Sequence, residues 1–133
     1  MIDEREVNLP GVLAEVEAAF ERYERALVAN DVAALDELFW NHPLTLRFGV
    51  NENLWGWDEI AAFRAARPAQ GLDRRIVRRT IQTFGTDFAT ASVTFARDAR
   101  PSWVGRQQQT WVRMPAGWRV VAAHVSFMGV PAP

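Results

Sequence analysis

Two charged side chains in this sequence are of the types that recognise small anions or move protons. Arg47 lies among apolar residues in the stretch LTLRFG, and Glu52 follows in the polar turn of VNENLWGW. A guanidinium can bind a carboxylate through paired hydrogen bonds, and a carboxylate can act as a general base. Arg47 is therefore either an anion clamp or a solvent-facing strand residue. Glu52 is either a base, the partner of Arg47, or a solvated loop residue.

A second group of polar side chains lies toward the C-terminus. The stretch GRQQQTWVR holds three glutamines in succession, and a strand sends alternate side chains to opposite faces, so both faces must carry amides. Such amides can both donate hydrogen bonds to a bound ligand and accept them from it. His124 is either a proton-transfer group or a core histidine with satisfied hydrogen bonds. Ser126 lies two residues on, ~6–7 Å away along a strand, which is too far for a serine–histidine dyad.

The segment LWGWDEIAAFRAARP adds aromatic and cationic candidates. Trp55 and Trp57 carry more apolar surface than a connecting loop usually holds, so we expect Trp55 to cover a pocket or to enter a subunit contact. Arg64 and Arg67 are three positions apart on a helix, a rotation of about 300°, so only one of them should face a pocket. We assign Arg64 to substrate binding.

Composition excludes several functional classes. The 133 residues carry a formal net charge of -1, the 15 cationic residues are all arginine, and cysteine is absent, which leaves no disulfide and no thiolate chemistry. The arginine pairs at 74–75 and 78–79 form only a weak basic patch, so no nucleic-acid partner is expected. No apolar run is long enough for a membrane helix, and the N-terminus MIDEREVNLPG is acidic, unlike a signal peptide. We expect a cytoplasmic protein with no membrane partner.

Cofactor and metal chemistry also lack support in the sequence. The two histidines, His42 and His124, belong to no spaced set of metal ligands, so no metal site is expected. Neither a glycine-rich phosphate loop nor a GxSxG nucleophile motif is present, and we expect no cofactor.

The periodicity of the chain predicts the elements that position these residues. Apolar spacings of three and four predict a helix after Pro10 and a second helix capped by Asp31. A short strand at 43–49 and a polar turn at 51–53 precede a third helix, capped by Asp58 and ending by Pro68. Beyond Gly71 the period becomes two, which predicts two hairpins with turns at 85–87 and 115–117. The order predicts one α+β domain over residues 1–133, in which a curved, mainly antiparallel sheet wraps the helices in its concave face and encloses a pocket.

Two stretches carry a resemblance to a known family. LRFGVNENLWGWDEIAAFRAARP and GRQQQTWVRMPAGWRVVAAHVSFMG resemble the AtzH-like family, which includes HpxZ-type proteins found with oxalurate catabolism. The order of elements is similar to that of the nuclear-transport-factor-2-like (NTF2-like; also cystatin-like or SnoaL-like) superfamily. A typical member reads GRQSQTW, so Gln108 departs from the pattern while Gln107 and Gln109 match it. The resemblance implies a role beside amidases that process ring-opened ureides.

The resemblance also implies which strand faces line the pocket. Both faces of GWRVVAAHVSF are mostly apolar, and the superfamily pattern puts Trp118 and the His-x-Ser residues inward. The expected inner wall then consists of Thr94, Gln107, Gln109, His124 and Ser126. The opposite face would carry Val112, Val121, Val125 and Phe127, too apolar for solvent, which predicts a homodimer packed through these faces.

Two functions of different class follow. In the first, the protein is a cofactor-free enzyme: Arg47 anchors a carboxylate, the glutamines hold a urea-like group, and His124 or Glu52 moves a proton during hydrolysis, deamination or decarboxylation. In the second, it is a ligand-binding accessory that assembles with a separate amidase. Function has to be argued from the site, since the fold alone does not distinguish these two hypotheses.

Overall fold

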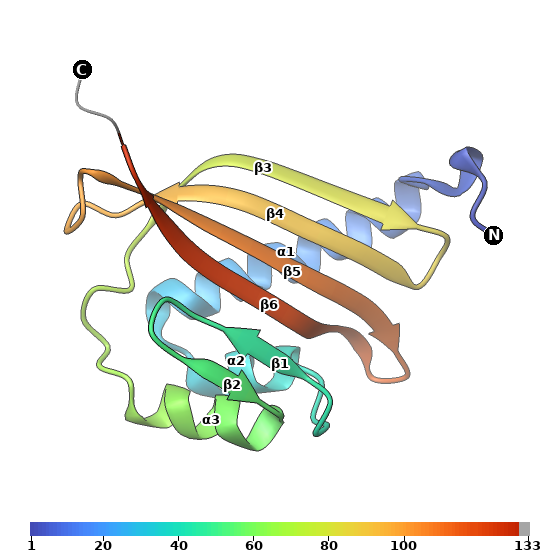
Figure 1. Ribbon diagram of the computed structural model, residues 1–133. Coiled ribbons are helices and arrows are strands. Elements are labelled where there is room, and N and C mark those ends of the chain that lie inside the picture. Colours follow the sequence, from blue (N-terminus) through green and yellow to red (C-terminus); the bar gives the residue numbers. More distant parts are fainter. Residues whose placement is uncertain (131–133) are drawn as a thin grey trace.

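The computed structural model describes residues 1–130, in which three α-helices pack on a six-stranded sheet (Figure 1). The elements in chain order are η1 (Glu4–Glu6), α1 (Pro10–Ala29), α2 (Val32–Leu38), β1 (Leu46–Phe48), β2 (Asn53–Trp55), α3 (Trp57–Ala66), β3 (Arg75–Phe84), β4 (Phe88–Ala96), β5 (Trp103–Met114) and β6 (Gly117–Gly129). The predicted α+β class, with helices packed on a curved and mainly antiparallel sheet, is confirmed.

The helices begin and end where local sequence dictates, with one exception. Pro10 occupies the first position of α1, and Asn30 ends that helix in the left-handed conformation. Asp31 caps α2 as predicted, because its carboxylate accepts a hydrogen bond from the Ala34 N–H at 3.1 Å. The prediction that Asp58 caps α3 is wrong: Gly56 occupies that position with φ 88°, and Asp58 lies in the first turn.

The sheet has the order β2-β1-β6-β5-β4-β3. Both predicted hairpins are confirmed, since β3 pairs with β4 and β5 with β6 in antiparallel fashion. β2 was expected to be a turn, and it instead pairs antiparallel with β1. β1 in turn runs parallel to β6, with Arg47 opposite Ala123. This one parallel contact places Arg47 and Glu52 beside the C-terminal strand.

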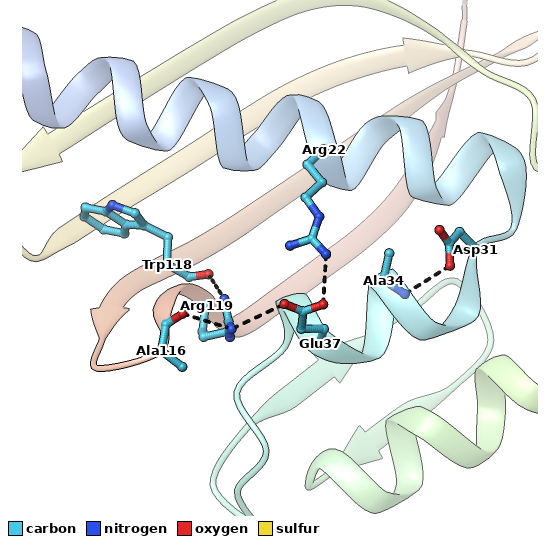
Figure 2. A network of polar contacts seen from close by, with 7 residues as sticks. All are labelled: Arg22, Asp31, Ala34, Glu37, Ala116, Trp118 and Arg119. Carbon is cyan, nitrogen blue, oxygen red and sulfur yellow. Dashed lines mark hydrogen bonds and ion pairs between the residues drawn. The ribbon is translucent and has the colours of Figure 1, made fainter.

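A polar network fixes the turn end of β6 against the first two helices (Figure 2). Glu37 on α2 accepts a hydrogen bond from Arg22 of α1 at 2.9 Å, and the Arg22 guanidinium lowers the pKa of the Glu37 carboxyl. Arg119 of β6 lies 3.8 Å from the same carboxylate and donates to the carbonyls of Ala116 and Trp118. The network therefore links α1, α2 and the β5–β6 hairpin.

A β-bulge divides β6 into two segments: even-numbered residues face the helices before the bulge, and odd-numbered residues face them after it. Trp111 pairs with Val120 and Thr110 pairs with Ala122, so Val121 is an extra residue without a partner across the ladder. Trp118 and Val120 are buried under the helices as expected, but beyond the bulge the inward residues are Ala123, Val125 and Phe127.

The bulge corrects two expectations. His124 and Ser126 lie on the outer face of the sheet, because they pair with Gln108 and Arg106, and Thr94 joins them opposite Arg106. Conversely, Val125 and Phe127 pack against the hydrophobic core, so the apolar outer face predicted from them is wrong. Within residues 1–130, no helix combines the length and apolar character needed to span a membrane.

Candidate functional site

A cavity of about 530 Å³ opens between α3, the β1–β2 turn, the β4–β5 turn and the inner face of β6. Its lining residues are Arg47, Val50, Glu52, Phe63, Arg67, Pro68, Gln70, Gly71, Leu72, Arg97, Ala99, Arg100, Val125 and Phe127. Four of these residues are arginines, and a single one is acidic. The cavity is therefore suited to a small organic anion.

Arg47 and Glu52 form the polar edge of this cavity. The Nη1 of Arg47 donates to Oε1 of Glu52 at 2.9 Å, and the Asn51 N–H donates to Oε2 at 3.2 Å. Gly49 makes this arrangement possible, since a Cβ at that position would stand 1.7 Å from Glu52 Oε1. The predicted pairing of Glu52 with Arg47 is confirmed, and both side chains are largely shielded from solvent.

Three further arginines surround the opening, and their charges are only partly compensated. Arg67 and Arg100 form no ion pair with any residue of 1–130, and Nε and Nη2 of Arg67 are buried without a hydrogen-bond partner. Arg97 donates to the Gly71 carbonyl. Burial lowers the pKa of Arg67, and the neighbouring charge of Arg47 lowers it further. The pKa of Arg97 falls for the same reason, with Arg74, Arg67 and Arg100 adding to the effect of burial.

Aromatic rings hold these arginines at the opening. The guanidinium carbons of Arg47 and Arg67 lie 5.4 and 5.9 Å from the centre of the Phe63 ring. Arg100 lies 4.7 Å from the centre of Phe127. Such cation–π contacts orient a guanidinium while leaving its N–H groups free to bind a ligand. An anion would therefore meet donors that are already in position.

Arg64 and Tyr23 lie deeper, beneath the cavity. Arg64 is 3% exposed, donates to Asp36 at 3.0 Å and stacks 4.1 Å from the centre of the Phe39 ring. It does not line the cavity; Arg67 does. Burial lowers the pKa of Arg64, as it does for Arg67 and Arg97. Tyr23, the single tyrosine of the chain, belongs to the hydrophobic core, where its ring lies 6.3 Å from that of Phe39.

Gln107 and Gln109 face inward as predicted, although neither lines the arginine-rich cavity. They are 3% and 1% exposed, and the Nε2 atoms of both are buried without a hydrogen-bond partner. Gln109 Oε1 accepts a hydrogen bond from the Trp111 indole at 3.1 Å. Gln107 pairs across the ladder with Val125, which lines the cavity, so Gln107 lies next to the cavity wall. Gln109 pairs with Ala123, which does not line it, and lies deeper in the core.

The other predicted site residues are gathered on the opposite face of the sheet. A hollow of about 520 Å³ there is bordered by Thr94, Arg106, Gln108, His124 and Ser126, among others. Trp55 also lies on this side, because it pairs with Leu46, whose neighbour across β6 is Ala122. The structure thus separates Arg47 and Glu52 from His124, Ser126, Thr94 and Trp55. Among residues 1–130, no group of three His, Asp or Glu side chains could hold a metal ion.

Sequence reasoning missed Arg97 and Arg100, and it chose Arg64 over Arg67 as the residue that faces the pocket. Arg97 and Arg100 fall in RDARPSW, a turn whose charged residues are also typical of solvated loops. An available signal was the absence of Asp or Glu near Arg67, since an arginine without a local partner has its donors free.

Comparison with known proteins identifies the family. The AtzH-like family model matches residues 5–131. The chain belongs to the AtzH-like family. Among curated proteins, none matches this sequence.

Solved structures agree with this assignment. A protein of unknown function from the DUF3225 family of Pectobacterium atrosepticum is 55% identical over 97% of this chain and 100% of its own, with a TM-score of 0.95. A cystatin-like fold protein from Burkholderia xenovorans is 48% identical over 95% and 98% of the two chains, with a TM-score of 0.90. An NTF2-like protein of unknown function from Pseudomonas putida, 17% identical over 85% and 84%, shares the fold at a TM-score of 0.70.

Proposed function

We propose that this AtzH-like protein binds a small ureide bearing one or two carboxylates in the arginine-lined cavity and catalyses its cofactor-free decarboxylation. The observation that carries the proposal is the charge imbalance of the cavity: Arg47, Arg67, Arg97 and Arg100 line it together with the single carboxylate of Glu52. An N-carboxy ureide of the ring-opened triazine type supplies the missing negative charge. Oxalurate supplies it as well, but its carboxylate is on an acyl carbon, so for oxalurate the corresponding reaction is hydrolysis. We expect this activity in the cytoplasm.

Ligand binding follows from the positions of the arginines. The unpartnered Nε and Nη2 of Arg67 match the two oxygens of a carboxylate, and Arg97 and Arg100 provide further donors on the opposite side of the opening. A ligand that reaches past Val125 meets the free Nε2 groups of Gln107 and Gln109, which suit a urea carbonyl oxygen.

The residues around the cavity favour proton transfer over covalent catalysis. Its lining contains no serine, threonine or histidine, so no side-chain nucleophile of the usual kinds faces the ligand. Loss of carbon dioxide from an N-carboxylate breaks the N–C bond and places a proton on the nitrogen, and Glu52 is the one side chain of the lining, besides the arginines, that can exchange a proton. Hydrolysis through a water activated by Glu52 is the second chemistry that these groups allow.

The test is a mass-spectrometric turnover assay of the purified protein with oxalurate, carboxybiuret and dicarboxyurea. We expect turnover of at least one of them, about 100-fold slower in Arg67→Gln. The matched control is Arg113→Gln, which removes an exposed arginine paired with Asp87 at the far end of the sheet. It should retain full activity.

Two other outcomes of these measurements would contradict catalysis by this protein. A ligand-dependent rise in melting temperature without turnover, or a stable complex with a ureide amidase, would make the protein a non-catalytic accessory. If none of these anions is turned over and none shifts the melting temperature, the proposed function is wrong.

A further inference from the structure

A second hollow lies toward the opposite end of β6 from the arginine cavity, between α2, the start of α3 and the β5–β6 turn. Its volume is about 420 Å³, and it is bordered by Asp36, Glu37, Trp40, Trp57, Ala116 and Arg119, among others. Figure 2 shows three of these residues gathered where α2 faces the β5–β6 hairpin. The hollow shares no lining residue with the arginine cavity. Its size suits a small organic molecule.

Two tryptophans line this hollow, and contacts within the protein fix both indole rings. The Trp57 indole N–H donates to the Asp36 carbonyl at 3.0 Å. The Trp40 ring stacks on the His42 imidazole, with 4.1 Å between the ring centres and 3° between the planes, and its backbone N–H donates to Val120 at 3.0 Å. Both indoles remain partly exposed. Rings that are already in position lose little entropy when a ligand stacks on them, and indole is the side chain that attracts a cation most strongly.

The two carboxylates of the hollow retain oxygen atoms that can accept further hydrogen bonds. Asp36 Oδ1 accepts from Arg64 at 3.0 Å, whereas Oδ2 takes no side-chain hydrogen bond from residues 1–130. Glu37 Oε2 accepts from Arg22 at 2.9 Å, while its Oε1 lies 3.8 Å from Arg119, beyond hydrogen-bond distance. A carboxylate offers about four lone pairs, so one bonded arginine leaves room for another donor.

The charge of the lining favours a cation over an anion. Arg119 is the single cation among the described residues of the lining, against the carboxylates of Asp36 and Glu37. Its Nη1 and Nη2 already donate to the carbonyls of Trp118 and Ala116, at 3.0 and 3.2 Å. An anion would therefore find few free donors here, in contrast to the arginine cavity.

Arg64 shows how a planar cation is held at one oxygen of Asp36. Its guanidinium donates to Oδ1 and lies 4.1 Å from the centre of the Phe39 ring. Phe39 also lines the hollow, together with the two indoles. The remaining carboxylate oxygen and the aromatic rings thus offer a ligand the same combination of contacts that Arg64 uses.

We propose that this hollow is a second binding site, which takes a small planar organic cation with N–H donors, of the amidine or guanidine class. The cation stacks against the indoles of Trp40 and Trp57 and donates to the carboxylates of Asp36 and Glu37. The site is independent of the proposed function, because its ligand carries the opposite charge and contacts none of the residues that line the arginine cavity.

Isothermal titration of the wild-type protein with benzamidine tests the proposal. We expect one site per chain, and at least about tenfold weaker binding of benzoate, which has the same shape and the opposite charge. Ala116→Arg places a cation at the exposed rim of the hollow and should weaken benzamidine binding at least about tenfold, with an unchanged circular dichroism spectrum. Ala65→Arg is the matched control, at an exposed position about 12 Å along α3 from Trp57, and should keep the wild-type affinity.

A milder variant and a second ligand complete the test. Glu37→Gln removes one charge at nearly constant side-chain size, and benzamidine affinity should fall about threefold, as for the loss of an exposed ion pair. N-acetylarginine amide in the same titration distinguishes a free cation from the arginine side chain of a partner protein, because the tighter of the two ligands identifies the source. The proposed site is wrong if benzamidine fails to bind the wild type, if benzoate binds as tightly, or if Ala116→Arg retains the wild-type affinity.

Discussion

The two faces of the sheet carry the same kinds of side chain in different states. On the inner face Gln107 and Gln109 are buried with unpartnered Nε2 atoms, next to a cavity lined by arginines. On the outer face Gln108 is exposed and bonded to Ser92. Leaving a polar group buried and unpaired costs free energy, so the inner arrangement motivates the proposed ligand, whereas the outer amide already has a hydrogen-bond partner.

The substitution Arg47→Ala tests the difference between the two faces most strongly, because we expect it to have the largest effect on turnover. Removal of the guanidinium takes away a ligand donor and leaves Glu52 without its partner. We expect turnover of the proposed ureide to fall about 100-fold, about 2.7 kcal/mol of transition-state stabilisation. The measurement is kcat/KM by mass spectrometry, with Arg113→Ala as the control for the loss of an exposed arginine. If the two variants are equally active, Arg47 is not needed for turnover and the cavity is not the site of the reaction.

A second variant pair tests the two faces through stability. Gln109→Leu removes the acceptor of the buried Trp111 indole N–H, which should lower the free energy of unfolding by about 1–3 kcal/mol. Gln108→Leu on the outer face should change it by less than about 0.5 kcal/mol. Urea unfolding followed by tryptophan fluorescence gives both values. The comparison fails if Gln108→Leu proves the more destabilising of the two.

Gly49→Ala sharpens the account of the cavity edge. Its methyl group would occupy the position of the Glu52 carboxylate, which must then leave Arg47. We expect a roughly tenfold fall in kcat/KM, about 1.4 kcal/mol, with little change in ligand affinity because Arg47 keeps its donors. Isothermal titration of the ligand and turnover of the same preparation separate these effects. A variant with normal kcat/KM would show that the Glu52 position is irrelevant to the reaction.

The smallest expected effect is that of His124→Ala. The imidazole lies on the outer face with the Phe48 ring 6.0 Å away, on the side of the sheet that the cavity does not reach. Turnover should stay within about twofold of the wild type, since the ligand never contacts it. The same assay used for Arg47→Ala measures this. Loss of activity in a correctly folded His124→Ala variant would indicate that the reaction takes place on the outer face.

The elements of this fold could largely be predicted, and the limits have physical causes. Helix periodicity and turn residues predicted α1, α2 and both hairpins. Alternation in GRQQQTW left two registers, and the resemblance to the superfamily chose the one that places Gln107 and Gln109 inward, as observed. His124 and Ser126 were assigned to the wrong face because Val121 bulges in a run that is apolar on both sides. In such a run no change of hydrophobicity marks the extra residue.

The site was predictable only in part, for a different reason. The pairing of Arg47 with Glu52 followed from their closeness in sequence. Arg67, Arg97 and Arg100 come from a helix end and a turn that lie 30 residues apart and meet only in the folded chain. Sequence patterns record which face a residue occupies, and they carry little information on which loops converge.

The bulge at Val121 decides which side chains β6 presents to each face of the sheet. Trp111 pairs with Val120 and Thr110 with Ala122, so the ladder on either side of Val121 is regular. Deleting Val121 would therefore remove the bulge and leave His124 and Ser126 outside, with Val125 and Phe127 inside. If the same residues paired without a bulge, Val121 would take the place opposite Thr110 and every later side chain of β6 would change faces, so one unpaired residue determines the facing of the whole C-terminal half of the strand.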